Sequence, residues 1–328
     1  MMRRREFTTL LGGAAAWPLA ARAQQQGGLP VRRIGILMSA RSVELEARVT
    51  VFRQRLEALG WSEGRNLQID LRWDAIEPEQ ARALATQLLS RAPDLIVVGN
   101  PIPLEAVLQL SRAVAVLFLS ITDPVEMGYV QSYSRPGGNV TGFTNFETQT
   151  AAKWVELLKE ISPRTTRAMV IMQSPTRAMR TMLGVIENKA SSLGIVLQST
   201  EIRSAAEIER AVESFARERD GGLIVHVGPI LAHREPIVGQ AVRHKLPAVY
   251  PFRFYIESGG LISYGVDGID IYRRGSAYAD RILRGEQPSS LPIQNPTKCE
   301  LVINLRTAKA LGLDIPPTLL AIADEVIE

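Results

Sequence analysis

The chain has 328 residues, of which 46% are hydrophobic and 22% charged, with a formal net charge of +4. This is an ordinary globular composition. Without residues 1–23, Lys+Arg falls to 34 and Asp+Glu to 33, so the remaining chain is near +1 and no nucleic-acid-binding face is implied. About 300 residues exceed what one hydrophobic core usually holds, so we expect two lobes.

The first 23 residues predict an export signal. A basic start, an uncharged apolar run over 8–21 and an A-x-A site are its three parts, with cleavage expected after Ala23. The adjacent Arg4 and Arg5, with Phe7 two places on, form a twin-arginine pattern, typical of a bacterial route that exports folded proteins. A membrane anchor is the alternative, but the apolar run is too short to span about 30 Å of hydrocarbon. We therefore expect a periplasmic protein.

The first half of the mature chain predicts alternating strands and helices. Short apolar runs indicate buried strands, and apolar residues at a period near 3.6 indicate helices. In chain order we expect a strand over 34–38, a helix over 43–59, a strand over 67–71, a helix over 78–90, a strand over 95–98, a helix over 104–112 and a strand over 114–119.

The second half repeats this order. We expect a strand over 168–172, a helix over 176–193, a strand over 195–199, a helix over 205–219, a strand over 223–227, a helix over 230–244 and a strand over 246–250. This alternation predicts an α/β fold of two Rossmann-like lobes with parallel sheets and right-handed crossovers. Residues 134–142 are rich in Gly and Pro but lack the spacing of a phosphate-binding loop, so we expect a connector there.

The sequence offers no recognisable catalytic or metal-binding motif. The histidines His226, His233 and His244 lack zinc-site spacing, and G-x-S-x-G is absent. The single Cys299 cannot form an internal disulfide, and we expect it to pack at the start of a strand. His226 lies at the end of a predicted strand and could be a base, a ligand contact or a structural histidine. We therefore expect no enzyme, no metal and no cofactor.

Polar and aromatic residues follow the carboxyl ends of the predicted strands, where open parallel sheets bind ligands. Ordinary βα loops also need such residues for turns and caps, and that alternative stays open for each loop taken alone. With residues near the predicted crossings between lobes, the candidate ligand-binding residues are Ser39, Asn100, Ser120, Thr122, Asp123, Thr144, Asn145, His226, Tyr250, Phe252, Tyr264 and Asp267.

Several segments resemble the ABC transporter substrate-binding protein family. They include R-P-G-G-N-V-T-G-F-T-N at 135–145, G-G-L-I-S-Y-G-V-D at 259–267 and the whole of 296–328. The resemblance covers nearly the whole mature chain. It implies the type I fold of periplasmic binding proteins, with two lobes joined by three crossings. The chain departs from the family pattern at Cys299 and in two cleft loops, so the ligand of the family cannot simply be transferred.

The resemblance also implies how the chain is divided. We expect a first lobe at 31–142 plus 268–290, a second lobe at 147–262, crossings near 143–146, 263–267 and 291–300, and a C-terminal strand and helix within 291–328. The protein would be a monomer that closes around a small polar ligand and docks on an ABC permease in the inner membrane. A sensory subunit that presents its ligand to a membrane receptor is the alternative.

An amino acid is the expected ligand, since the family resembles members that bind amino acids. Its ammonium would pair with Asp123, and Tyr250 and Phe252 would flank its side chain. Tyr264 and Asp267 would touch the ligand or latch the closed state. The ligand carboxylate would be held, with the adjacent backbone N–H groups, by Ser39, Asn100 and Thr122.

Overall fold

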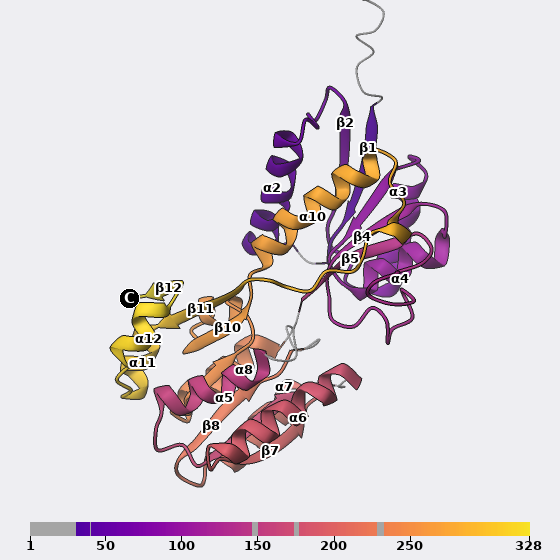
Figure 1. Cartoon of the computed structure of the whole chain (residues 1–328). Helices are drawn as coiled ribbons and strands as arrows, with labels where there is room; N and C mark the ends of the chain where they lie inside the picture. Colours follow the sequence, from indigo (N-terminus) through magenta and orange to yellow (C-terminus); the bar gives the residue numbers. More distant parts are fainter. Residues whose placement is uncertain (1–30, 40, 146–149, 174–176, 228–232) are drawn as a thin grey trace, which may run out of the picture.

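The computed structural model describes residues 31–39, 41–145, 150–173, 177–227 and 233–328, which form two α/β lobes (Figure 1). The predicted signal lies outside these residues, as do 146–149, 174–176 and 228–232. Within the described ranges, no helix combines the length and the apolar character needed to span a bilayer.

The first lobe contains a five-stranded parallel sheet with the order β2-β1-β3-β4-β5. Its strands are β1 (Arg32–Leu37), β2 (Leu67–Arg72), β3 (Leu95–Val98), β4 (Ala115–Ile121) and β5 (Val140–Thr144). Its helices are α2 (Val43–Ala58), α3 (Pro78–Leu89), α4 (Pro101–Leu110) and α10 (Gly268–Leu283), with a short 3-10 turn, η2, at Pro288–Ser290. The predicted order of strands and helices in this half is confirmed.

Successive residues of each strand pack against different helix layers. Ile36 lies in a core with residues of α2 and α10, whereas Leu37 lies in a core with residues of α3 and α4. Helix α10 therefore completes the first lobe although it comes late in the chain, as Figure 1 shows.

The prediction of a connector over 134–142 is wrong at its end, because β5 begins at Val140 and pairs with β4. Gly142 explains the difference. A Cβ atom there would overlap the backbone oxygen of Phe118, so glycine is what allows the two strands to approach closely.

The second lobe contains a seven-stranded sheet with the order β12-β11-β10-β9-β8-β6-β7. Its strands are β6 (Arg167–Met172), β7 (Val196–Glu201), β8 (Gly221–Val225), β9 (Ala248–Tyr250), β10 (Ile262–Val266), β11 (Cys299–Asn304) and β12 (Glu325–Ile327). Its helices are α5 (Thr150–Ile161), α6 (Arg177–Ser192), α7 (Ala205–Phe215), α8 (Arg234–Arg243), α9 (Phe254–Glu257), α11 (Leu305–Leu311) and α12 (Pro317–Ile322). Residues of α5 and α6 share one core, and residues of α7 and α8 share the other.

Two features of this sheet differ from the predictions. β10 and β11 pair antiparallel, so the sheet is mixed rather than all parallel. Residues 263–267 were expected to cross between the lobes, but all except Asp267 belong to β10, between β9 and β11. Gly265 permits this, because a Cβ atom would overlap the backbone of Pro251. The strand that Cys299 was predicted to begin is confirmed as β11.

The chain passes between the two sheets three times. It leaves the first sheet after Thr144, returns at Asp267 on entering α10, and leaves again between Gln294 and Cys299 (Figure 1). This arrangement forms the hinge, and it places the carboxyl ends of both sets of parallel strands at the boundary between the lobes.

Candidate functional site

The carboxyl edge of the first sheet holds candidates that already have local structural contacts. Asn100 caps α4, because its Oδ1 accepts a hydrogen bond of 3.0 Å from the N–H of Ile102. Asp123 Oδ1 accepts a bond of 3.1 Å from the N–H of Glu126. Ser120 has a positive φ of 92° where the pairing of β4 and β5 shifts. These residues thus shape the edge of the cleft, and Asp123 Oδ2 has no hydrogen bond to any described residue.

A cavity of about 430 Å³ opens between the lobes at this edge. The first lobe lines it with the turn after β4, and the second lobe with the start of α6. The lining residues are Asp123, Val125, Glu126, Ser132, Tyr133 and Arg177. This volume falls in the range of small-molecule sites, which run from roughly 300 to 1,000 Å³. Another cavity, of about 350 Å³, lies against α2 and β2 of the first lobe alone.

The cavity between the lobes has a mainly apolar surface, and its lining residues include opposite charges from the two lobes. Asp123 belongs to the first lobe and Arg177 to the second. Tyr133 and Val125 supply apolar surface, and burial together with the charge of Asp123 raises the pKa of the Tyr133 hydroxyl, which stays neutral. Such a site suits a ligand that carries both charges and an apolar group.

One hydrogen bond spans the cleft itself. The backbone N–H of Arg177 donates to Glu126 Oε1 at 2.9 Å, which joins the turn after β4 to the first residue of α6. Neither Glu126 nor Arg177 was among the predicted site residues. A charged residue in a turn or at a helix start carries no sequence signal of its partner when that partner lies in the other lobe.

Two buried amides lie next to the cleft with an unpaired oxygen. Oδ1 of Asn145, directly after β5, and Oε1 of Gln173, directly after β6, are buried without a hydrogen-bond partner among the described residues. Buried polar atoms are normally paired, so these oxygens are suited to accept hydrogen bonds from a ligand. Asn145 was predicted as a site residue, whereas Gln173, in an equivalent position after a strand, was noted as a polar strand end but not included among the predicted site residues.

The candidates of the second lobe are more deeply buried. His226 has no exposed surface, its Nδ1 lies 2.8 Å from the oxygen of Val227, and burial lowers its pKa. Its ring meets Trp154 edge-on with centroids 6.3 Å apart. Its Nε2 is buried without a hydrogen-bond partner among the described residues, so a role for His226 in ligand contact stays a prediction.

The aromatic candidates divide in the same way. Tyr250 is only 1% exposed and stacks on Tyr255 with centroids 5.0 Å apart, because β9 lies in the middle of the sheet. Its ring therefore offers no surface to a ligand. Phe252 is half-buried and stacks on Phe254 at 5.3 Å, and its role in the cleft stays a prediction, as do those of the half-buried Ser39 and Thr122.

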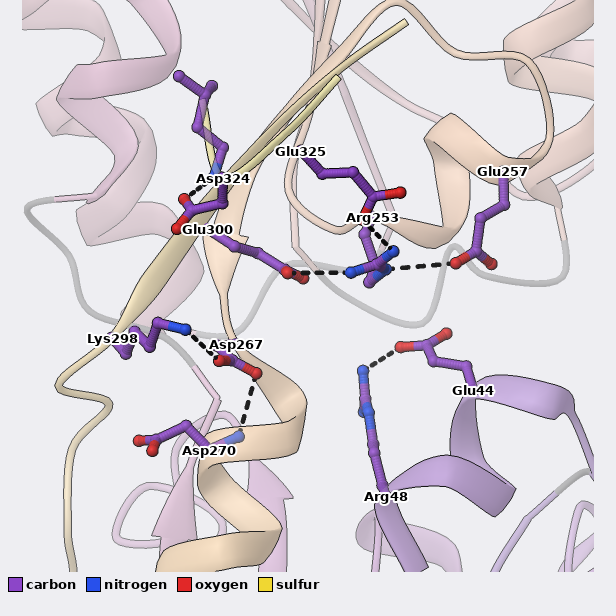
Figure 2. Close-up of polar contacts among 11 residues, drawn as sticks. Glu44, Arg48, Arg253, Glu257, Asp267, Asp270, Lys298, Glu300, Asp324 and Glu325 are labelled. Atoms are coloured by element: carbon purple, nitrogen blue, oxygen red, sulfur yellow. Dashed lines mark hydrogen bonds and ion pairs between the residues drawn. The ribbon is translucent and has the colours of Figure 1, made fainter. Parts of the chain in front are cut away.

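The predicted residues at the crossings hold the hinge together. Thr144 donates to Asn295 at 3.0 Å, which ties the first crossing to the third. Asp267 accepts from the N–H of Asp270 at 3.0 Å, capping α10, and from Lys298 at 3.0 Å (Figure 2). Burial alone would raise the pKa of Asp267, but these bonds outweigh it and the pKa is lowered. Tyr264 contributes its backbone oxygen, which accepts from the indole of Trp154 at 2.6 Å.

A cluster of charges lies beside the hinge. Arg253 pairs with Glu257 at 3.3 Å, with Glu300 at 3.2 Å and with Glu325 at 2.7 Å, which joins the loop after β9 to β11 and β12 (Figure 2). Burial raises the pKa of Glu300 although Arg253 opposes the change. In Figure 2 the ion pair of Glu44 and Arg48, on α2 of the first lobe, faces this cluster.

No group of three or more His, Cys, Asp or Glu residues in the described ranges is arranged to hold a metal ion. The described site consists of a mainly apolar cavity at the cleft edge, with charged residues of both lobes in its lining, and of a polar hinge.

Comparison with known proteins agrees with this architecture. The chain is 24% identical over 283 residues to a tyrosine-binding protein of Clostridioides difficile, covering 86% of this chain and 81% of that protein. A conserved domain protein of Vibrio cholerae is 26% identical with a TM-score of 0.78, covering 90% of this chain and 99% of that structure.

A domain from Streptococcus pneumoniae in complex with L-Trp is 23% identical with a TM-score of 0.79, again over 90% of this chain and 99% of that structure. At this identity, the likeness shows the shared fold of two lobes. The family model described as ABC transporter substrate binding protein matches residues 33–327. The chain thus belongs to the ABC transporter substrate-binding protein family.

Proposed function

We propose that this protein is the periplasmic solute-binding component of an ABC importer and that it captures an amino acid by closure of its two lobes. The observation that carries the proposal is the cavity between the lobes, with Asp123 on one side and Arg177 on the other. A zwitterion would satisfy both charges at once. Relatives described as binding tyrosine or L-Trp support an amino acid with an aromatic side chain.

In this mechanism each lobe holds one part of the ligand. The ammonium group would bind Oδ2 of Asp123, which has no hydrogen bond to a described residue, and the carboxylate would pair with the guanidinium of Arg177. Tyr133 and Val125 would pack against the apolar part. Because the ligand contacts both lobes only when they are close, it stabilises the closed form by its higher affinity for it. The closed monomer would then dock on the permease.

The test is calorimetry of the mature protein with L-tyrosine and L-tryptophan as probes. Losing a buried hydrogen bond to a charged group costs about 1.5–3 kcal/mol, so Asp123→Ala should weaken binding roughly ten- to hundredfold. Melting of the empty protein should change little. Glu187→Ala, on the exposed side of α6, is the matched loss of a carboxylate and should bind like wild type. Unchanged affinity in Asp123→Ala would place the ligand elsewhere.

Export is tested separately, because the proposed signal ends before the described residues. The mature protein should begin at Gln24 and be recovered from the periplasm. Replacing Arg4 and Arg5 together by lysine should leave a folded precursor in the cytoplasm, detected by fractionation and N-terminal sequencing. Normal export of the double variant would instead assign the general secretory route.

A further inference from the structure

The first turn of α6 binds a carboxylate that belongs to the other lobe. Backbone N–H groups in the first turn of a helix lack partners within the helix, and the positive end of the helix dipole attracts anions. The first turn of α6 contains no acidic residue and starts with Arg177. Glu126 of the first lobe fills this place, with its Oε1 at 2.9 Å from the N–H of Arg177.

Three other helices of the protein supply such a partner from their own N-terminal residues. α2, α7 and α10 are capped by the side chains of Ser42, Ser204 and Asp267, and each has an acidic residue in its first turn. In α6, which has 16 residues, the acid comes from across the cleft. The contact can exist only while the edges of the two lobes are close. It therefore stabilises the arrangement with close lobes and not a more open one.

The turn that carries Glu126 is fixed by the proposed ligand-binding residue. Asp123 Oδ1 accepts the N–H of Glu126 at 3.1 Å, and the backbone oxygen of Asp123 accepts the N–H of Met127 at 3.1 Å. A ligand held by Asp123 Oδ2 would therefore bind the same carboxylate that positions Glu126. Closure of the lobes and occupation of the cavity are thus connected through a single short turn.

We propose that Glu126 is a latch between the lobes: its bond to the start of α6 raises the population of the closed form and thereby sets the ligand affinity. Glu126 is a positioning residue that acts through the equilibrium between open and closed forms. Because apparent affinity scales with the fraction of competent protein, loss of the latch should weaken binding about three- to tenfold. The affinity part rests on the proposed function, whereas the conformational part does not.

The primary experiment therefore uses the empty protein. Spin labels are attached at Gln80→Cys on α3 and Glu213→Cys on α7, both exposed positions, in a Cys299→Ser background. Electron–electron double resonance then measures the distance distribution between the lobes. We expect Glu126→Gln to shift this distribution towards longer distances, because the neutral amide loses the attraction to the helix end.

Position 177 gives a matched pair of variants. Arg177→Pro deletes the donating N–H, and proline is well tolerated at the first helical position, so it should open the lobes as Glu126→Gln does. Arg177→Ala keeps the backbone N–H, so the distribution of distances between the spin labels should stay close to that of wild type. Combining Glu126→Gln with Arg177→Pro should open the lobes less than the sum of the two separate effects, since both changes weaken the same contact. Glu187→Gln, a loss of charge elsewhere on α6, should leave the distribution unchanged.

An unchanged distribution in Glu126→Gln would overturn the latch, whatever the protein binds. Calorimetry with L-tyrosine adds a second readout, which is the direction in which the ligand affinity changes in Glu126→Gln. Weaker binding in Glu126→Gln supports the latch. Tighter binding would mean that Glu126 occupies the place of the ligand carboxylate, and equal binding would mean that the contact does not affect closure. Failure of wild type to bind the probe would count against the proposed ligand but would leave the distance measurement intact.

Discussion

At the hinge, the lobes are connected by partly buried, charge-assisted contacts such as Asp267 with Lys298, whereas at the mouth of the cleft they are connected by an exposed bond from Arg177 to Glu126. The Asp267 side chain is 9% exposed, and its bonds join α10 to the third crossing. The contrast indicates that the hinge keeps its geometry in every state, while the cleft contact can form and break. Changes at the hinge should therefore alter stability, and changes at the mouth should alter the distance between the lobes and the affinity.

The largest effect on stability should come from Gly265→Ala in β10. The added Cβ would overlap the backbone oxygen of Pro251, which cannot move away as a flexible side chain could. We expect a loss of about 3 kcal/mol or more, at the upper end of overpacking effects, measured by urea unfolding. Gly184→Ala on α6 is the control, because its Cβ meets no atom within 4 Å. It should stabilise the protein by about 0.4–1 kcal/mol. Wild-type stability of Gly265→Ala would show that the hinge strand is pliable.

An intermediate effect is expected for Asp267→Asn, which keeps the size of the side chain but loses its charge. Weakening the pair with Lys298 and the cap of α10 should cost about 2 kcal/mol at pH 7. The folded protein holds the pKa of Asp267 below its ordinary value of 3.8. This stabilisation is therefore present above pH 3.8 and is lost as the pH falls through the folded pKa.

Urea unfolding of both proteins at pH 7 and near pH 3 measures this difference. The difference in the free energy of unfolding between wild type and Asp267→Asn should be smaller at the lower pH. The distance between the lobes should remain that of wild type, in contrast to Glu126→Gln. If Asp267→Asn shifted the distance distribution but left stability unchanged, the roles that we assign to the hinge and to the mouth of the cleft would be reversed.

The alternating core of both lobes was predictable because the signal is local. The run of β3 and residues 168–172 of β6 are apolar throughout, since helices cover both faces of a parallel sheet. β5 and β10 were missed because each includes a glycine, Gly142 or Gly265, whose purpose is a close approach to another strand. The sequence shows the glycine but not the backbone that it lies against.

The site was less predictable for a related reason. Asn100 and Asp123 both follow strands, and their residue types suit helix caps and turns as well as ligands. Both residues make a local hydrogen bond in the structure, and only Asp123 of the two lines the cavity. Glu126 meets Arg177 only through the packing of two lobes, so no local pattern could indicate it. Tyr250 was misjudged because a strand end in the middle of a seven-stranded sheet can still be covered on both faces.

The smallest effect should come from Glu300→Gln beside the hinge. Burial raises the pKa of Glu300 above its ordinary value of 4.5, although Arg253 opposes this. The folded protein thus takes up a proton more readily than the unfolded chain, so this group lowers stability as the pH rises through its folded pKa. Wild type should gain stability relative to Glu300→Gln between pH 7 and about pH 5, by less than about 1 kcal/mol.

Glu257→Gln removes another carboxylate from Arg253 but leaves Glu300 in place, so it should keep the wild-type pH profile. Thermal melts across this pH range measure the difference. Parallel profiles for wild type and Glu300→Gln would mean that Glu300 is ionised at little cost, and that the charge cluster is already fully balanced by Arg253.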